Sequence, residues 1–222
     1  MTKKFSITID GPAGAGKTTQ AKALAKALGF VYVDTGAMYR ALAVYMRDKP
    51  MEQVPAALTE VNLQAAWDEE GNQRMVVNGE DVTDRLRTPE ISRLASDISA
   101  IPEVRDFLLE TQREIARENN VVMEGRDIGT VILPDATLKI FLTASLDERA
   151  WRRSQQLEPG TYLLPSVRKD IERRDRNDSS RDAAPLTRAE DATLVNSTYM
   201  NARETTQVIL RLWGEALAQK AD

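Results

Sequence analysis

A glycine-rich stretch near the N-terminus carries residue types that bind phosphate. After a short apolar run, Gly11, Gly16, Lys17 and Thr18 fit the pattern G-x-x-x-x-G-K-[ST]. Glycines let successive backbone N–H groups turn inward onto a phosphate, and the start of the next helix adds the positive end of its dipole. The lysine reaches the outer phosphates, and the threonine hydroxyl is a ligand for Mg²⁺.

This pattern predicts a strand, a phosphate-binding loop and a helix from about residue 17 to 28, which together bind a nucleoside triphosphate. The alternative is a glycine-rich turn that only joins the strand to the helix. The residues expected to contact ATP are Gly11, Pro12, Ala13, Gly14, Ala15, Gly16, Lys17, Thr18 and Thr19.

The composition narrows the chemistry. The chain has 222 residues, of which 42% are hydrophobic and 29% charged, so we expect a single domain over residues 1–222 that buries a sizeable core. It has no cysteine and no histidine, which excludes thiol catalysis, disulfides, a His general base and Cys or His metal ligation. Carboxylates, arginines, lysines, hydroxyls and a borrowed metal ion remain. Phosphoryl transfer suits that set because it needs mainly positioning and charge neutralisation.

The sequence also bears on location and partners. A net charge of −4 disfavours non-specific binding to nucleic acid. No apolar stretch is long enough to span a bilayer, and the N-terminus passes from Lys4 straight into a strand instead of a signal peptide. We therefore expect a cytoplasmic monomer that binds small molecules, without nucleic-acid or membrane partners.

A second strand at residues 30–33 completes a βαβ unit and so predicts a parallel sheet. It ends in Asp34-Thr35-Gly36, and helical spacing resumes from about 37 to 46. The carboxyl ends of parallel strands form the ligand edge of such a sheet, which makes Asp34, Thr35 and Arg40 candidates for ligand contacts. An N-cap at Asp34-Thr35 and a surface cation at Arg40 are the competing interpretations, and local sequence leaves both open.

Residues 49–88 change in character. Segments 63–67 and 74–78 read as short strands with a turn between them, and 77–82 suggests a second hairpin. This predicts a small antiparallel insertion that by itself offers no chemistry. Two helices follow, beginning near Thr88-Pro89 and after Pro102. Ser96 and Arg105 lie in this region and could both be on solvated helix faces, and local sequence does not argue otherwise.

A buried-looking strand at residues 121–123 ends in Glu124, an acid placed to help hold Mg²⁺ through water. The sequence Gly125-Arg126-Asp127-Ile128-Gly129-Thr130 follows, and it sets an Arg-Asp pair between glycines at the strand's carboxyl end. The structural alternative is an arginine and an aspartate that satisfy each other within one turn. We favour a functional role for both residues.

Arginines crowd the last third of the chain. A strand at 137–142 precedes a helix at 144–156, and a break at Glu158-Pro159-Gly160 separates that helix from another beginning near Pro165. Either these helices have solvated faces with i,i+4 partners, or they form a lid that closes arginines over phosphates. The two are compatible, because an open lid is a solvated face. A strand at 192–196 and a helix at about 202–218 complete the chain. The arginines in question are Arg149, Arg152, Arg153, Arg173, Arg174, Arg176 and Arg181.

Four stretches resemble bacterial cytidylate kinases, and the likeness covers nearly the whole chain. They are residues 11–19, residues 34–40, the family-specific Gly-Arg-Asp-Ile-Gly-Thr at 125–130, and Arg174-Asp175 with Asp178, Arg181 and Ala184-Pro185-Leu186. The resemblance implies an α/β fold of the P-loop NTPase type, adenylate-kinase-like, with a five-stranded parallel sheet flanked by helices. It also implies an acceptor-binding region at about 35–105 that includes a β insertion at about 61–90, and a lid at about 150–180.

The resemblance further implies the reaction and the residues. The γ-phosphoryl group of ATP would pass to CMP or dCMP with Mg²⁺, giving CDP or dCDP in pyrimidine nucleotide metabolism. The metal would be held by Thr18 and, through water, Glu124. Catalytic roles would fall to Lys17, Arg126, Arg152, Arg153 and Arg181. The acceptor residues would be Arg40, Arg126 and Arg181 for the CMP phosphate, Ser96, Arg105 and Asp127 for cytosine, Arg174 and Asp178 for ribose, and Thr35 beside them.

Two other functions remain open from the residues alone. One is a nucleotide switch or ATP-sensing interaction protein, although the guanine-reading sequence Asn-Lys-x-Asp is absent. The other is a kinase for a different small acceptor, such as AMP, UMP or shikimate. The choice of cytosine rests on the resemblance.

Overall fold

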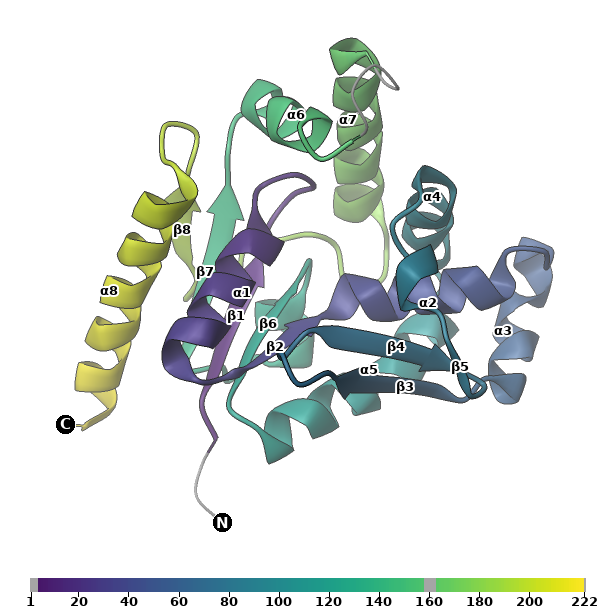
Figure 1. The fold of residues 1–222 in the computed structure, drawn as a ribbon, viewed down its shortest axis with the longest axis horizontal. Helices are drawn as coiled ribbons and strands as arrows, with labels where there is room; N and C mark the ends of the chain where they lie inside the picture. The colour runs from purple at the N-terminus through teal and green to yellow at the C-terminus, as the bar shows by residue number, and fades with distance from the viewer. Residues whose placement is uncertain (1–3, 158–162, 222) are drawn as a thin grey trace.

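The computed structural model describes residues 4–157 and 163–221, and a five-stranded sheet forms its centre (Figure 1). The strand order is β2-β6-β1-β7-β8, and every neighbouring pair is parallel. Strands β1 and β6 are buried along almost their whole length, as expected where helices cover both faces of a parallel sheet. The predicted fold class is confirmed. The strands are β1 (Ser6–Asp10), β2 (Val31–Asp34), β6 (Val121–Gly125), β7 (Leu138–Thr143) and β8 (Thr193–Asn196).

Helices cover the two faces of this sheet and form two apolar cores. On one face, α1 and α8 pack against each other and against Ile7 and Ile140. On the other face, α2, α4 and α5 pack around Val33 and Met123. These helices are α1 (Lys17–Leu28), α2 (Thr35–Met46), α4 (Pro89–Ile98), α5 (Pro102–Glu118) and α8 (Ala202–Ala221), and a short helix, α3 (Val54–Ala57), follows α2.

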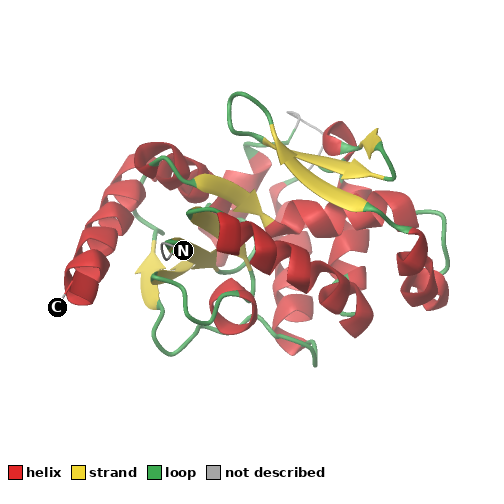
Figure 2. Cartoon of the chain, turned by 90° about the horizontal axis from the view of Figure 1, so that it is seen from below, coloured by secondary structure: helices red, strands yellow, loops and turns green. Residues whose placement is uncertain are grey.

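The insertion predicted after α3 is an antiparallel sheet of three strands. It contains β3 (Leu63–Trp67), β4 (Gln73–Val77) and β5 (Glu80–Asp81), in the order β3-β4-β5. Figure 2 shows this sheet beside the core sheet and not within it. Because Met75 and Val77 are buried in the core around α2, the insertion packs firmly against that face of the fold.

Two helices, α6 (Leu146–Ser154) and α7 (Leu164–Ser180), lie above the carboxyl ends of the core strands (Figure 1). Ala150, Val167 and Ile171 pack together with Ala13 of the glycine-rich loop. These helices agree with the predicted helical pair of the lid, whereas the predicted break at residues 158–160 lies outside the described residues.

One local structure was not predicted. Residues Ile128–Ile132, within the Gly-Arg-Asp-Ile-Gly-Thr block and just after it, form a single π-helical turn. Backbone groups that this turn leaves unpaired need other partners. The two carboxylate oxygens of Asp10 accept hydrogen bonds from two of its backbone N–H groups. Among the described helices, none is long and apolar enough to cross a membrane.

Candidate active site

The glycine-rich loop joins β1 to α1 at the carboxyl edge of the central strand. Gly11 has a φ of 146°, and a Cβ there would lie 2.0 Å from the carbonyl oxygen of Leu142. Gly16 is the N-cap of α1 and has a φ of 94°. Only glycine suits both positions, because side chains strain such a backbone and β7 leaves no room beside Gly11. The strand, loop and helix therefore form as the motif predicts.

Lys17 is buried at the start of α1 and folds back across the loop. Its Nζ donates hydrogen bonds to the carbonyl oxygens of Gly11 (2.8 Å) and Pro12 (2.9 Å). Burial lowers the pKa of Lys17 to about 7, and the positive charge of Arg126 acts in the same direction. An ammonium held this way is poised to exchange carbonyl partners for phosphate oxygens, which are stronger acceptors.

Glu124 is buried at the carboxyl end of β6, close to the loop. Its Oε1 accepts a hydrogen bond of 2.7 Å from the Tyr32 hydroxyl. Burial and the charge of Asp34 raise the pKa of Glu124, while Lys17 and the Thr18 hydroxyl favour its ionised form. Thr18 and Glu124 are thus close enough to interact, and both offer oxygen atoms, the donors that Mg²⁺ prefers.

Arg126 and Asp127, adjacent in sequence, bind different partners. Arg126 Nε donates to Asp178 Oδ2 at 2.6 Å, and although burial opposes it, this pairing raises the pKa of Arg126. Asp127 instead pairs with Arg105 and, at 3.4 Å, with Arg181. The interpretation of an Arg-Asp pair satisfied within one turn is therefore wrong.

Ser96 and Arg105 do not lie on solvated faces. The Arg105 side chain is 10% exposed, and its guanidinium lies over the ring of Tyr39, 5.7 Å from the ring centre. The Ser96 hydroxyl is buried. The assignment of these two residues to solvent is wrong, and the contact with Asp127 brings Arg105 to the residues that the family resemblance selected.

Several buried polar atoms in this region lack a hydrogen-bond partner. Arg174 is an example: its Nε is unpaired, and burial together with Arg126 lowers its pKa to about 10. Buried polar groups are normally satisfied, so unpaired donors are suited to bind a ligand or an ordered water. Within the described ranges, the unpaired buried side-chain atoms are Thr8 Oγ1, Arg40 Nε, Ser96 Oγ, Gln112 Nε2 and Arg174 Nε. Three of these five belong to predicted CMP-binding residues.

Asp34, Thr35 and Arg40 make structural contacts where β2 ends and α2 begins. Asp34 caps α2 by accepting from the Ala37 N–H (2.9 Å), and its second oxygen accepts from Arg40 Nη2 (2.7 Å). The N-cap interpretation is therefore confirmed for Asp34, whereas Arg40 is paired and only partly exposed, unlike a free surface cation. Thr35 donates its hydroxyl to the Glu124 carbonyl (2.8 Å), which joins the ends of β2 and β6.

The two arginines predicted for a lid, Arg152 and Arg153, differ in their contacts. Arg152 donates to the Ser197 carbonyl (2.6 Å) and pairs with Glu148 (2.8 Å), which fixes it between α6 and the turn after β8. Arg153 contacts the Gln156 side chain (3.2 Å); burial lowers its pKa, and so does the charge of Arg40. Arg152 also lies near the glycine-rich loop, since its Nη1 donates to the Ala15 carbonyl at 3.4 Å. Arg153 instead lies close enough to Arg40 for that charge to affect it.

Two aspartates that sequence reasoning did not place at the site hold its parts together. Asp175 of α7 accepts from the Ala13 N–H (2.9 Å) and pairs with Arg149 of α6, which ties both helices to the loop. Asp10 accepts from the N–H groups of Ile128 (2.8 Å) and Gly129 (2.7 Å). The signal for Asp10 was a charged residue at the end of an otherwise apolar strand, directly before the glycines.

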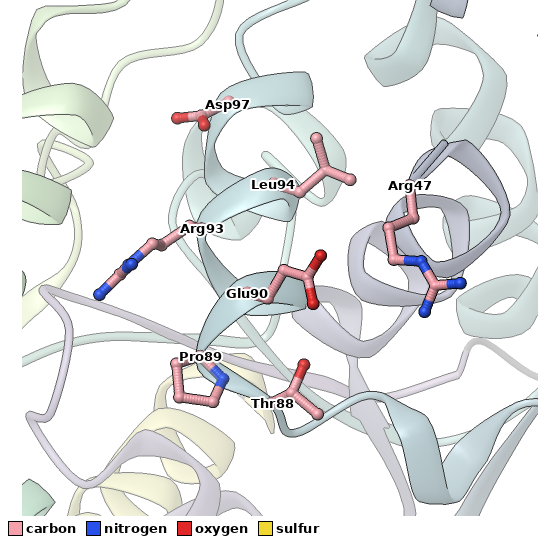
Figure 3. A pocket seen from close by; sticks show the side chains of 7 residues that line it. All are labelled: Arg47, Thr88, Pro89, Glu90, Arg93, Leu94 and Asp97. Atoms are coloured by element: carbon pink, nitrogen blue, oxygen red, sulfur yellow. The ribbon is translucent and has the colours of Figure 1, made fainter. Parts of the chain in front are cut away.

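Two hollows lie on the acceptor side. One of about 620 Å³ is bordered by the start of α4 and by Arg47 (Figure 3), and it holds none of the predicted site residues. The other, about 260 Å³, is lined by Asp34 and Arg40 together with Gln73 of the insertion. Of the predicted site residues, only Asp34 and Arg40 line the smaller hollow, so it adjoins the predicted site at Arg40.

A loop that binds one phosphate chain, with arginines nearby for a second anion, is what a kinase needs when its acceptor is itself phosphorylated. The fold and site therefore define a P-loop phosphotransferase. A family model described as "Cytidylate kinase" matches residues 7–215. The chain belongs to the cytidylate kinase family.

Known proteins support this membership. The chain is 43% identical to a cytidylate kinase from Caldicellulosiruptor saccharolyticus, over 98% of this chain and 99% of the relative. It is 47% identical to one from Pelotomaculum thermopropionicum, over 92% of this chain and 94% of the relative. A solved structure of an uncharacterized protein from Eubacterium ventriosum shares the fold, with a TM-score of 0.55, 13% identity and coverage of 96% of this chain and 99% of that one.

Proposed function

We propose that this kinase transfers the γ-phosphoryl group of ATP to CMP and dCMP, and that the arginines described above hold the acceptor. The observation that carries the residue assignment is the set of buried, unpaired donors at Arg40, Ser96 and Arg174 beside the ion pairs of Arg126 and Arg181. Cations that retain free N–H groups while buried are suited to an anionic, hydrogen-bonding ligand.

The acceptor residues divide by chemistry. Arg40, Arg126 and Arg181 hold the CMP phosphate, because arginine is permanently charged and binds phosphate with two parallel hydrogen bonds. Arg174 and Asp178 hold the ribose. Ser96, Arg105 and Asp127 read cytosine, with the pairing between Arg105 and Asp127 fixing the orientation of both side chains.

No general base is required, because a phosphate monoester is largely dianionic near neutral pH. The obstacle is repulsion between the two phosphate groups. Each pair of unit charges about 4 Å apart costs roughly 1 kcal/mol in water and about 4 kcal/mol at an effective dielectric constant near 20. Arginines around the acceptor, and Lys17 with the lid arginines Arg152 and Arg153 around the donor, offset this repulsion.

Mg²⁺ fits the donor set beside the loop, where Thr18 would hold it directly and Glu124 through water. When bound, it neutralises charge on the donor phosphates. The chain itself orients the Glu124 carboxylate. The Tyr32 hydroxyl donates a hydrogen bond to that carboxylate, and the Thr35 hydroxyl donates one to the Glu124 carbonyl. Closure of α6 and α7 excludes water and so suppresses hydrolysis of ATP.

A coupled assay of ADP release tests this function. ADP should form rapidly with CMP or dCMP and only slowly without an acceptor. AMP, UMP and shikimate should be poorer acceptors than CMP. Release of ADP that does not depend on any acceptor would instead indicate a nucleotide switch, and a preference for another acceptor would contradict the assignment of Ser96 and its neighbours.

A further inference from the structure

The insertion touches the active site at the open edge of the core sheet. Strand β2 is an edge strand, since only β6 pairs with it. Alternate residues of a strand direct their backbone polar groups to the same edge. Here Tyr32 and Asp34 face the insertion, and side chains of the small sheet cover both. Trp67 Nε1 donates to the Tyr32 carbonyl at 2.7 Å.

Gln73, the first residue of β4, binds Asp34 twice. Its Oε1 accepts from the Asp34 N–H at 2.7 Å, and its Nε2 donates to the Asp34 carbonyl at 3.3 Å. A side-chain amide with this geometry replaces the peptide group of a missing neighbouring strand. The backbone at Asp34, which ends β2 and caps α2, is therefore held from outside the core sheet.

Asp34 in turn aims Arg40. Its carboxylate accepts from Arg40 Nη2 at 2.7 Å, and the two side chains are only 13% and 20% exposed. There is little free space around the pair: a Cβ at Gly36 would lie 3.0 Å from Arg40 Nη1 and 3.1 Å from Asp34 Oδ1. A shift of the Asp34 backbone would therefore move the guanidinium. Gln73 and Arg40 also line the same hollow of about 260 Å³.

We propose that Gln73 is a positioning residue for the acceptor phosphate, acting on Arg40 through Asp34. This rests on the assignment of Arg40 to the CMP phosphate in the function proposed above. The insertion then has a functional role, because Gln73 of the small sheet orients Arg40, a cation that binds substrate. The effect should fall on acceptor binding, because the amide of Gln73 bonds to Asp34, and Asp34 in turn to Arg40, which is assigned to the acceptor.

The test compares steady-state kinetics of Gln73→Ala with the wild type, varying CMP and ATP separately. We expect the KM for CMP to rise about tenfold, as loss of a hydrogen-bonded pair predicts, while kcat and the KM for ATP change less than about twofold. Gln64→Ala is the matched control: Gln64 is an exposed glutamine of the same small sheet, and its replacement should leave all constants unchanged. Gln73→Met keeps the length of the side chain without its amide and should raise the KM for CMP as Gln73→Ala does. It separates loss of the amide from any loosening of the insertion by the shorter alanine.

The route through Arg40 is tested by a double variant. Arg40→Ala alone should raise the KM for CMP strongly, and adding Gln73→Ala to it should change the KM less than about twofold, because the group being positioned is already gone. An unchanged KM in Arg40→Ala would refute the proposed role of Arg40. A normal KM in both Gln73 variants, or a full tenfold effect that persists without Arg40, would overturn the role of Gln73 while leaving the function standing.

Discussion

Asp10 provides a test of the site's electrostatics that does not depend on catalysis. It is 5% exposed, and both of its oxygens accept backbone N–H groups of the π-helical turn. Burial nevertheless raises the pKa of Asp10 from 3.8 to about 6, because two hydrogen bonds do not fully replace water. The perturbation is Asp10→Asn, which keeps the volume of the side chain and removes the ionisation.

The direction in which stability changes with pH follows from proton binding. The folded chain holds the Asp10 proton more tightly than the unfolded chain, so this group adds stability below pH 3.8 and loses that contribution as the pH rises through about 6. A tenfold change in proton affinity corresponds to about 1.4 kcal/mol. The shift in the pKa of Asp10 therefore corresponds to a change in unfolding free energy of roughly 3 kcal/mol. Asparagine lacks this dependence but turns an amide donor toward one backbone N–H, at a pH-independent cost of about 1–3 kcal/mol.

Urea unfolding of both proteins without nucleotide, from about pH 4 to pH 7.5, measures the difference. Asp10→Asn should be the less stable protein at the acid end. The difference in unfolding free energy should shift in its favour by roughly 2 kcal/mol by neutral pH, because part of the full change is already complete at about pH 4. Asp135→Asn, at an exposed aspartate, should follow the wild type throughout. A free-energy difference that is flat within about 1 kcal/mol, or that grows toward neutral pH, would refute the argument from burial.

Three further variants probe the acceptor side. Arg126→Ala should lower turnover of CMP roughly 100-fold or more, and it leaves Asp178 buried without its cation. ATP binding, measured by titration, should persist. Unchanged kinetics would show that Arg126 does not belong to the site. Ser96→Ala should leave thermal stability unchanged and reduce the preference for CMP over UMP about tenfold, and an unaltered preference in the coupled assay would contradict a contact with the base. Gly36→Ala should raise the KM for CMP several-fold, because the added Cβ would press on the Arg40 guanidinium, even though alanine favours helices. A normal KM would show that the Arg40 side chain can move aside without loss of CMP binding.

The fold could be predicted because its signals are local. Apolar runs ending in polar residues marked the parallel strands, and the glycine pattern fixed the loop between β1 and α1. The N-cap at Thr88 and the proline after it marked the start of α4, where the Thr88 hydroxyl does accept from the Ile91 N–H. Each of these features depends on residues only a few positions apart.

The site was harder to predict because its partners lie far apart in sequence. Arg126 pairs with Asp178, 52 residues away, and not with its neighbour Asp127, so no local pattern could distinguish the two. Arg105 looked solvated on its own helix, because the carboxylate that holds it follows a different strand. Gln73 acts through backbone atoms, which carry no sequence signature at all.

The charge balance of the proposed acceptor site favours a phosphate monoester as the ligand. Asp34 pairs with one arginine, Asp178 with another, and Asp127 with two more. These are four arginines, namely Arg40, Arg126, Arg105 and Arg181. Arg174, whose Nε is unpaired, makes five against three aspartates, an excess of two positive charges. The aspartates hold the guanidinium groups in place without cancelling them, which limits both the cost of burial and the side-chain entropy lost on binding. A dianionic phosphate matches the excess, whereas an uncharged acceptor such as a free nucleoside would leave two buried positive charges without an anion.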